Sequence, residues 1–240
     1  MIEKRKMLYD GKAKSLYEAD NDDEVIVYYK DEATAFNGVK KASIKNKGLL
    51  NNKISSIVFD YLIEQGVKTH FIKRLDEKSQ LCKKVTIIPL EFICRNQVAG
   101  AMAKRLGMAE GIKLDKPILE ISYKNDELND PFINDDYATT ALKVVTNEQL
   151  AYCYQQVLEI NKLLEALFLK TGISLIDFKV EFGIDKQGAI LLADEFSPDN
   201  CRLWEIATNR RLDKDVFRRD LDDIKDTYQL VLSKLEQLNL

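Results

Sequence analysis

Residues 173–183 read ISLIDFKVEFG, and this stretch decides the predicted fold. Asp177, Lys179 and Glu181 occupy every second position, with apolar side chains between them. A period of two predicts a β-strand with one apolar and one charged face. Taken alone, such a strand is more often half-exposed, with its charged face in water.

A second apolar run, AILLA at residues 189–193, follows DKQG at residues 185–188 and ends in Asp194 and Glu195. The DKQG tetrapeptide is typical of a hairpin turn. Because the second run is suited to burial on both sides, we expect the acids at its end to lie in a cleft. Pairing the two strands gathers carboxylates beside a lysine. That set suits a magnesium-bound polyphosphate, since Mg²⁺ prefers oxygen ligands.

Length and charge narrow the class of protein. A chain of 240 residues is long enough for one large domain or for two lobes around a cleft. Its 36 basic and 39 acidic residues give a net charge of -3, so we expect no nucleic acid partner. No apolar stretch approaches a membrane span, and none follows the charged N-terminus, so we expect a soluble cytoplasmic protein without a membrane partner. The four cysteines are far apart and predict reduced thiols.

His70 is the only histidine, and this scarcity is informative. Hydrolases of the Ser/His or Cys/His kind and most zinc enzymes need at least one well-placed imidazole. The surrounding GVKTHFIKRL favours a structural or exposed role for His70. The chemistry of the chain is therefore expected to depend on carboxylates, lysines, arginines and bound ions, which indicates phosphoryl-group handling.

The remaining elements predict an α+β fold. The first part of the chain predicts strands and one helix, at residues 8–18, 24–30, 48–66 (the helix, ending at Gly66), 69–75, 81–85 and 87–95. A basic segment at 98–107 and a loop-rich stretch through Pro117 and Pro131 follow. A capping box at 146–149 opens a helix to Thr171, and a last helix is expected over 213–238.

We expect two lobes that meet near Pro89 around a cleft. Residues 1–88 would form a β-rich lobe, and residues 89–240 a larger α+β lobe. On a strand, Lys12 and Lys14 would share a face and could clamp a triphosphate, although two lysines on a surface strand are more common. No GxxxxGK[ST] or GxGxxG motif supports a P-loop or a dinucleotide fold.

Two arginines and a polar loop complete the candidate site. Residues 194–204, DEFSPDNCRLW, place turn-forming residues between a buried strand and the only tryptophan, which suggests a functional loop or a plain surface turn. Arg95 and Arg202 each offer a fork of donors to a phosphate or carboxylate.

Four segments in this order and spacing resemble the SAICAR synthetases, the phosphoribosylaminoimidazole-succinocarboxamide synthases: LYDGKAKSLYE, IIPLEFICRNQVAGAMAKRLG, SLIDFKVEFG and LLADEFSPDNCRLW. The similarity covers essentially the whole chain. It implies a fold related to ATP-grasp and kinase-like folds, with two lobes around an ATP cleft. Residues 1–88 would be the nucleotide-binding lobe, and residues 89–240 would hold the substrate and metal site. It also implies a homodimer that uses ATP and Mg²⁺ to join L-aspartate to the carboxylate of CAIR, through an acyl phosphate, giving SAICAR, ADP and phosphate.

The resemblance also implies roles for individual residues. Nucleotide contacts would come from Lys12, Lys14, Lys83 and the backbone around Ile87, and the metal ligands would be Glu181 and Asp194. Lys179 would act with these two acids in catalysis, near the reacting carboxylate. The substrates would contact Arg95, Ala101, Lys179, Ser197, Asp199, Arg202 and Arg218. Two positions depart from the family pattern: Gly100-Ala101 stands where Gly-Ser is usual, and Asn37 where an acid is usual.

Two other functions fit the same residues. A small-molecule kinase of related fold could use an Asp-x-Lys strand beside a metal-binding acid. The other hypothesis is a module that binds a nucleotide as a sensor without turnover. Release of phosphate that depends on both aspartate and CAIR would separate the ligase from the kinase, which would leave phosphate on its acceptor.

Overall fold

The fold is described from a computed structural model that places residues 5–35 and 39–238. Among these residues, one antiparallel sheet has five strands in the order β1-β2-β3-β7-β6. Its strands are β1 (Met7–Asp10), β2 (Lys14–Glu18), β3 (Glu24–Tyr29), β7 (Ser79–Lys83) and β6 (Phe71–Arg74). The β2–β3 pairing confirms the predicted hairpin through residues 21–23.

The second, larger sheet is built around β12 (Ile173–Ile184). Its other strands are β8 (Thr86–Ile87), β9 (Leu90–Gln97), β10 (Lys113–Tyr123), β11 (Phe132–Ile133), β13 (Ile190–Ala193) and β14 (Cys201–Glu205). The β12–β13 hairpin is confirmed, and its register places Glu181 opposite Ala193, so that Asp194 follows directly. The interpretation of this strand as half-exposed is wrong, because Asp177 and Glu181 are each only 3% exposed.

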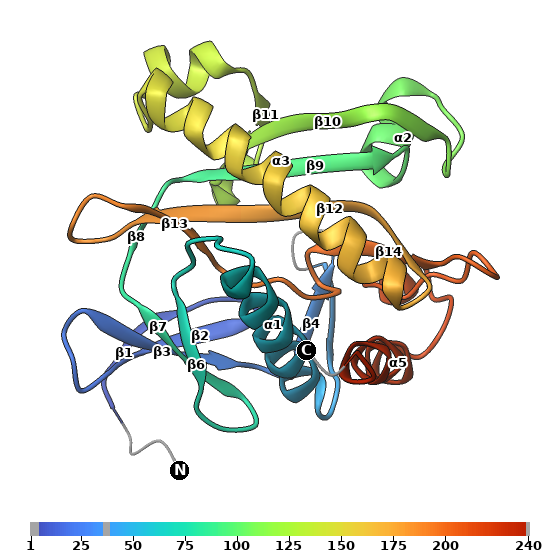
Figure 1. Ribbon diagram of the computed structural model, residues 1–240, viewed down its shortest axis with the longest axis horizontal. Coiled ribbons are helices and arrows are strands. Elements are labelled where there is room, and N and C mark those ends of the chain that lie inside the picture. The colour runs from blue at the N-terminus through green and yellow to red at the C-terminus, as the bar shows by residue number, and fades with distance from the viewer. Residues whose placement is uncertain (1–4, 36–38, 239–240) are drawn as a thin grey trace.

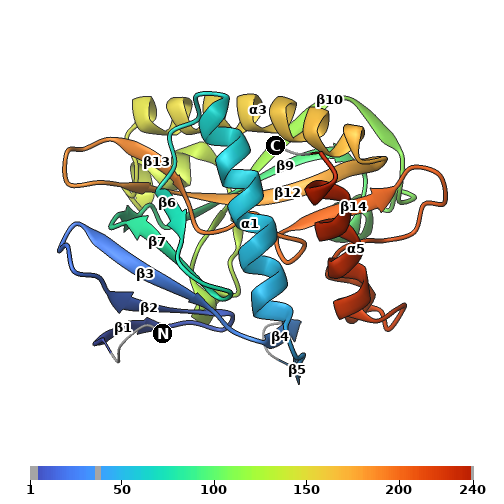
Figure 2. The same ribbon diagram turned by 60° about the horizontal axis from the view of Figure 1, so that its bottom comes forward.

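Helices cover the sheets. Figure 1 shows α3 (Asn147–Lys170) crossing the larger sheet, and Figures 1 and 2 together show α1 (Lys47–Glu64) beside α5 (Ile224–Glu236). The shorter elements are α2 (Gly100–Leu106), α4 (Asp215–Arg218), η1 (Asp126–Leu128), the π-helix η2 (Tyr137–Ala141) and the hairpin of β4 (Glu32–Ala35) and β5 (Lys40–Ser43). None of the helices in the placed segments combines the length and apolarity needed to cross a bilayer.

The α3 helix begins at the predicted capping box. The Thr146 hydroxyl accepts the Gln149 backbone N–H at 3.2 Å, and the Gln149 side chain accepts the Thr146 N–H at 3.0 Å. These two bonds satisfy donors that lack partners inside the first helical turn. Side chains at helical spacing then fill the core beneath the sheet: Leu150, Cys153, Val157, Ile160 and Leu164. The cysteines at 82, 94, 153 and 201 are buried free thiols, as expected.

Three local predictions are wrong. The stretch at 8–18 is interrupted after Asp10, because residues 11–13 form the turn between β1 and β2. The loop-rich stretch contains β10, in which Pro117 lies at a register irregularity that spares it a ladder hydrogen bond. The last helix is split into α4 and α5 by Asp220, which has φ +51°, and by Asp223, whose carboxylate caps α5. Aspartate side chains compete for backbone N–H groups and so favour helix ends.

Candidate functional site

A cavity of about 390 Å³ lies where β9, β12 and β14 meet the β1–β2 turn and α4. Its walls are largely charged, with side chains of both signs. The lining residues are Lys12, Thr34, Glu91, Ile93, Arg95, Asp130, Asp177, Phe178, Lys179, Asp199, Asn200, Cys201, Arg202, Lys214 and Arg218. The alternation along β12 places Asp177 and Lys179 at this cavity, which is why the period of two in the sequence identified it.

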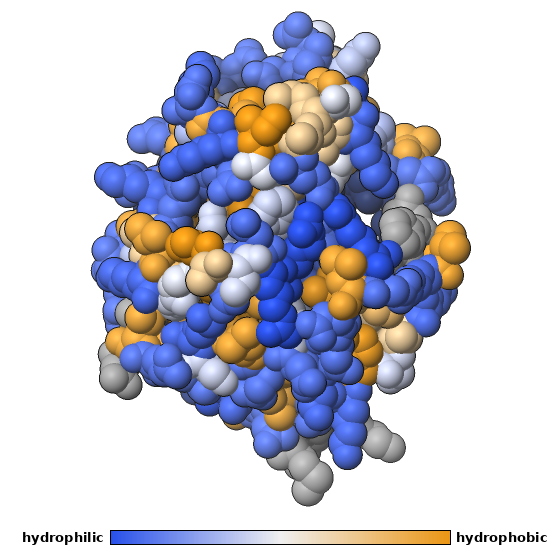
Figure 3. Space-filling view, turned by 90° about the vertical axis from the view of Figure 1, so that its right-hand side faces the viewer, coloured by the Kyte–Doolittle hydropathy of each residue, from blue (hydrophilic) through white to orange (hydrophobic). Residues whose placement is uncertain are grey.

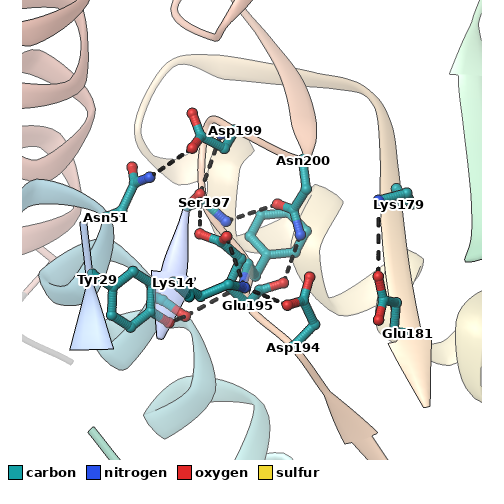
Figure 4. Close-up of polar contacts among 12 residues, drawn as sticks. Lys14, Tyr29, Asn51, Lys179, Glu181, Asp194, Glu195, Ser197, Asp199 and Asn200 are labelled. Carbon is teal, nitrogen blue, oxygen red and sulfur yellow. Dashed lines mark hydrogen bonds and ion pairs between the residues drawn. The ribbon is translucent and has the colours of Figure 1, made fainter. Parts of the chain in front are cut away.

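A half-buried lysine meets the acids at the end of the hairpin (Figure 4). Lys14 forms an ion pair with Asp194, and its Nζ lies 2.9 Å from a Glu195 carboxylate oxygen. Asp194 has φ +65°, a left-handed conformation that aspartate tolerates better than most residues. Burial opposes ionisation of Asp194, but the ammonium groups of Lys14 and Lys179 outweigh it and hold the pKa of the carboxyl at about 2.

A second set of acids and lysines lies beside the first. The Lys124 Nζ lies 2.7 Å from Glu181, and the Lys179 Nζ lies 3.8 Å from the same carboxylate and pairs with Glu91. Burial, and then the charge of Asp194, raise the pKa of Glu181 above its ordinary value. The carboxylates of Glu181 and Asp194 therefore share one electrostatic field, in which a cation is favoured.

The donor set fits a metal that shares its ligands with a phosphate. Across residues 5–35 and 39–238, no group of three or more His, Cys, Asp or Glu side chains is disposed to hold a metal ion. Protein sites for Mg²⁺ usually supply only one or two carboxylates, with water and phosphate oxygens completing the octahedron. Glu181 and Asp194 match that donor chemistry in kind and number.

Arginines and aspartates alternate along the other side of the cavity. Asp177 accepts from Arg95 at 2.8 Å and from Arg202 at 2.8 Å. Asp215 accepts the Arg202 Nε–H at 3.0 Å and an Arg218 N–H at 2.7 Å. Burial opposes the charge of Arg202, but Asp177 and Asp215 outweigh it and raise its pKa above the ordinary value. Both cavity arginines that bond Asp177 are thus held in fixed orientations.

Gly100 closes this side of the site at the start of α2. A Cβ there would lie 2.2 Å from an Arg202 guanidinium nitrogen, and the backbone has φ +54°. Gly107 ends the same helix at φ +64°, and a Cβ added at that position would meet nothing within 4 Å. Both positions therefore have a left-handed backbone that would strain an alanine, but only at Gly100 would the new methyl group also meet another side chain.

We expect Gly100→Ala to destabilise the fold by about 1 to 3 kcal/mol more than Gly107→Ala, because only the first methyl group collides with Arg202. Urea unfolding of the two variants measures the difference. Equal unfolding free energies would show that the Arg202 contact imposes no constraint.

Asp199 anchors the loop after β13. Its carboxylate accepts from Lys47 at 2.5 Å, Asn51 at 3.0 Å and Tyr228 at 2.7 Å, and Lys214 lies 3.9 Å away. Burial opposes its ionisation, but Lys214 and Lys47 hold the pKa of Asp199 well below its usual range. Asp199 thus ties α1 and α5 to the cavity wall, which gives it a structural role as well as a place in the cavity lining.

The structure gathers most of the predicted site residues and separates others. Lys12, Arg95, Lys179, Asp199, Arg202 and Arg218 line the cavity. Ser197 is fully buried and donates its hydroxyl to Glu195 at 2.6 Å. Ala101 is exposed on α2. Lys83 lines a separate depression beside Asp23 and Lys186. Ile87 lies on β8 and pairs with Gly183 of β12.

The expectation that Lys12 and Lys14 share a strand face is wrong, because β2 begins at Lys14 and Lys12 lies in the preceding turn. Lys12 instead forms an ion pair with Asp126 at 2.8 Å. Asn37, one of the two departures from the family pattern, lies outside the described residues.

His70 has the structural role that was predicted. It is buried, and its Nε2 lies 3.1 Å from the Asp194 carbonyl oxygen. Burial lowers the pKa of His70 from 6.5 to about 4. Because this pKa is depressed in the folded state, His70 leaves the stability of the fold unreduced above pH 6.5. That stability is lost as the pH falls from 6.5 through about 4, where the unfolded chain binds a proton that the folded chain does not.

We expect the unfolding free energy of the native chain to fall by about 2 kcal/mol more than that of His70→Gln between roughly pH 7 and pH 5, since only the native chain must keep an imidazole neutral. Urea unfolding at the two pH values measures both slopes. Parallel slopes would mean that His70 titrates normally in the fold.

Four functional candidates were missing from the sequence prediction. Glu91 and Lys124 enter the site only because β9 and β10 lie beside β12, and Asp215 and Lys214 only because α4 lies against β14. No local spacing connects them to Lys179 or Arg202. Glu91 stands inside the segment IIPLEFICR, which was the one available signal.

Known proteins share both the sequence and the fold of this chain. The family model for SAICAR synthetase matches residues 7–235. Phosphoribosylaminoimidazole-succinocarboxamide synthase of Clostridium beijerinckii is 54% identical, covering 98% of this chain and 100% of that protein. The crystal structure of the synthase from Ehrlichia chaffeensis has a TM-score of 0.94 at 46% identity, covering 96% of this chain and 98% of that one.

A further solved structure carries a nucleotide. It is a SAICAR synthetase in complex with ADP, with a TM-score of 0.92 at 44% identity, covering 96% of this chain and 97% of that one. The family match and the full-length relatives agree with one another and with the four motifs in the sequence. The chain belongs to the SAICAR synthetase family.

Proposed function

We propose that this chain is an ATP-dependent ligase that joins L-aspartate to the carboxylate of CAIR and forms SAICAR, ADP and phosphate in purine biosynthesis. Family membership and the relative that binds ADP support the activity. The observation that carries the proposal is the position of Glu181 and Asp194, which lie paired with lysines beside a cavity that contains oriented arginines.

The nucleotide would lie between two lobes, residues 1–88 and 89–240. Its phosphates would meet Lys14, and Lys12 would join them by exchanging Asp126 for phosphate. The backbone near Ile87 borders β12 and is a candidate contact for the adenine, with Lys83 nearby on β7. A relationship to ATP-grasp and kinase-like folds would explain a nucleotide cleft without a P-loop.

The chain's own residues account for the charge that the reaction must manage. A carboxylate is a poor acyl donor, so we propose that phosphoryl transfer first converts it to an acyl phosphate. For that transfer the substrate carboxylate and the triphosphate, both anions, must approach each other. At 4 Å two unit charges repel by about 1 kcal/mol in water and about 4 kcal/mol near a protein surface. Lys14, Lys124 and Lys179 would offset that repulsion. Mg²⁺ held by Glu181 and Asp194 would supply further neutralisation of the triphosphate.

The arginine side of the cavity would hold CAIR. Arg202 and Arg218 suit its phosphate, because guanidinium groups donate in a planar fork, and Arg95 would hold a neighbouring polar group. Ala101 lacks the hydroxyl common in the family, so that contact to the substrate phosphate is either lost here or supplied by another group. Asp199 and Ser197 are proposed near the aspartate pocket, where Asp199 lines the cavity wall and the Ser197 hydroxyl accepts the Asp199 backbone N–H at 3.2 Å.

A coupled assay tests the proposed activity. ADP and SAICAR should appear together only when ATP, CAIR and L-aspartate are all present, and omission of any one should abolish both. Phosphate retained on an acceptor without aspartate would favour the kinase. Nucleotide binding without turnover under every condition would favour a sensing module. A homodimer, drawn from the family resemblance, and a cytoplasmic location, drawn from the sequence composition, remain proposals.

A further inference from the structure

Glu110 joins three segments outside the cavity. It lies between α2 and β10, and one of its oxygens accepts the Gly100 backbone N–H at 2.9 Å and an Arg219 N–H at 2.6 Å. The other oxygen accepts from Arg211 at 2.8 Å and from Arg219 at 2.9 Å. One carboxylate therefore connects the start of α2, the segment after β14 and the end of α4.

Two of these connections, through Arg219 and through Gly100, lead to arginines in the cavity wall. Arg219 lies 3.4 Å from Asp215, which in turn holds Arg202 and Arg218. The Gly100 backbone lies directly against the Arg202 guanidinium. Glu110 therefore constrains Arg202 from two directions and Arg218 from one.

Glu110 is held in its ionised form. The hydrogen bonds from Arg219 hold the pKa of this carboxyl well below its usual range, and the Gly100 N–H and Arg211 act in the same direction. Arg211 also stacks on Trp204, with 4.5 Å between the guanidinium carbon and the ring centroid. Figure 3 shows this side of the molecule, where the most hydrophilic side chains gather in a continuous band across the surface.

The arginines divide into two groups. Arg202 and Arg218 line the cavity, whereas Arg211 and Arg219 bind Glu110 and are absent from the cavity lining. Glu110 accepts hydrogen bonds from both outer arginines, so fewer of their donors are left to compete for an incoming anion. The inner pair keeps its orientation toward the cavity.

We propose that Glu110 is a positioning residue for the phosphate-bearing substrate, acting through Gly100 and Arg219 to hold Arg202 and Arg218 in their binding orientation. This inference rests on the proposed function, since it assumes that CAIR binds at the arginine side of the cavity. Glu110 does not line the cavity and takes no part in the chemical step.

The test compares Glu110→Gln with the matched control Glu159→Gln, which removes an exposed carboxylate on α3. We expect Glu110→Gln to raise the KM for CAIR by about tenfold or more, because charge-assisted hydrogen bonds to two arginines are lost. The KM for ATP and for aspartate should change by less than about twofold, since their proposed contacts do not depend on Glu110. The control should match the native enzyme in all three constants.

Two further variants keep the test decisive if Glu110→Gln folds poorly. Arg219→Lys keeps the charge but cannot form both hydrogen bonds to Glu110, so it should raise the KM for CAIR in the same direction. Glu110→Asp keeps the charge on a shorter side chain, so its KM should lie between those of the native enzyme and Glu110→Gln.

The outcomes separate this inference from the proposed function. If the native enzyme forms SAICAR and all three variants keep a native KM for CAIR, the positioning role is wrong while the function stands. A fall in kcat and melting temperature with unchanged KM values would also overturn it, because it would indicate general structural support. If the native enzyme does not consume CAIR, the proposed function itself fails.

Discussion

Glu181→Gln and Asp194→Asn should each lower kcat by at least about a hundredfold, since losing several kcal/mol of charge stabilisation at a triphosphate corresponds to two or more powers of ten in rate. Both substitutions preserve side-chain size, and asparagine tolerates the left-handed backbone of residue 194. The fold should therefore survive. Steady-state kinetics with saturating CAIR and aspartate measure the effect.

The controls for this pair are a thermal melt and the Glu159→Gln variant on the exposed face of α3. Each site variant should melt cooperatively, and the control should retain native turnover. Near-native kcat in both site variants would remove these two acids from the proposed metal site and leave their lysine pairs as structural contacts.

Arg202→Ala should raise the KM for CAIR by about a hundredfold, because a hydrogen-bonded guanidinium at a largely desolvated phosphate site is costly to remove. The neighbouring carboxylates keep other partners: Asp177 retains Arg95, and Asp215 retains Arg218. We therefore expect the variant to fold. Initial rates over a range of CAIR concentrations give the KM.

Arg202→Lys is the informative comparison for this residue. Lysine keeps the charge but loses the planar fork that bonds Asp177 and Asp215 together with the substrate, so its KM should remain well above that of the native enzyme. A native KM for CAIR in Arg202→Ala would place the substrate phosphate away from this arginine.

The parts of the fold that sequence predicted well are those that local chemistry determines. The alternation in residues 173–183 and the turn at residues 185–188 were enough to predict the β12–β13 hairpin and the adjacent acids, because a period of two and a turn are local properties. The start of α3 was predicted for the same reason, since Thr146 and Gln149 cap each other directly.

The contacts that sequence did not predict depend on tertiary pairing. Lys124 reaches Glu181 across 57 positions, and Glu110 reaches Arg219 across 109, and neither pair has a local spacing that connects it. Taken alone, the charges of Asp177 and Glu181 favoured a half-exposed strand, because the arginine and lysine partners that allow their burial come from distant segments. The break between α4 and α5 was missed because apolar periodicity continues past Asp220 and Asp223.

A crystal structure of this chain with ADP and Mg²⁺ is the most direct test of whether Glu181 and Asp194 bind the metal ion. We expect the ion to lie between the phosphates and the carboxylates of Glu181 and Asp194, with Lys14 turned toward a phosphate oxygen. Phosphates bound elsewhere, with Asp194 still paired to Lys14 and Glu181 to Lys124, would contradict the proposed nucleotide site.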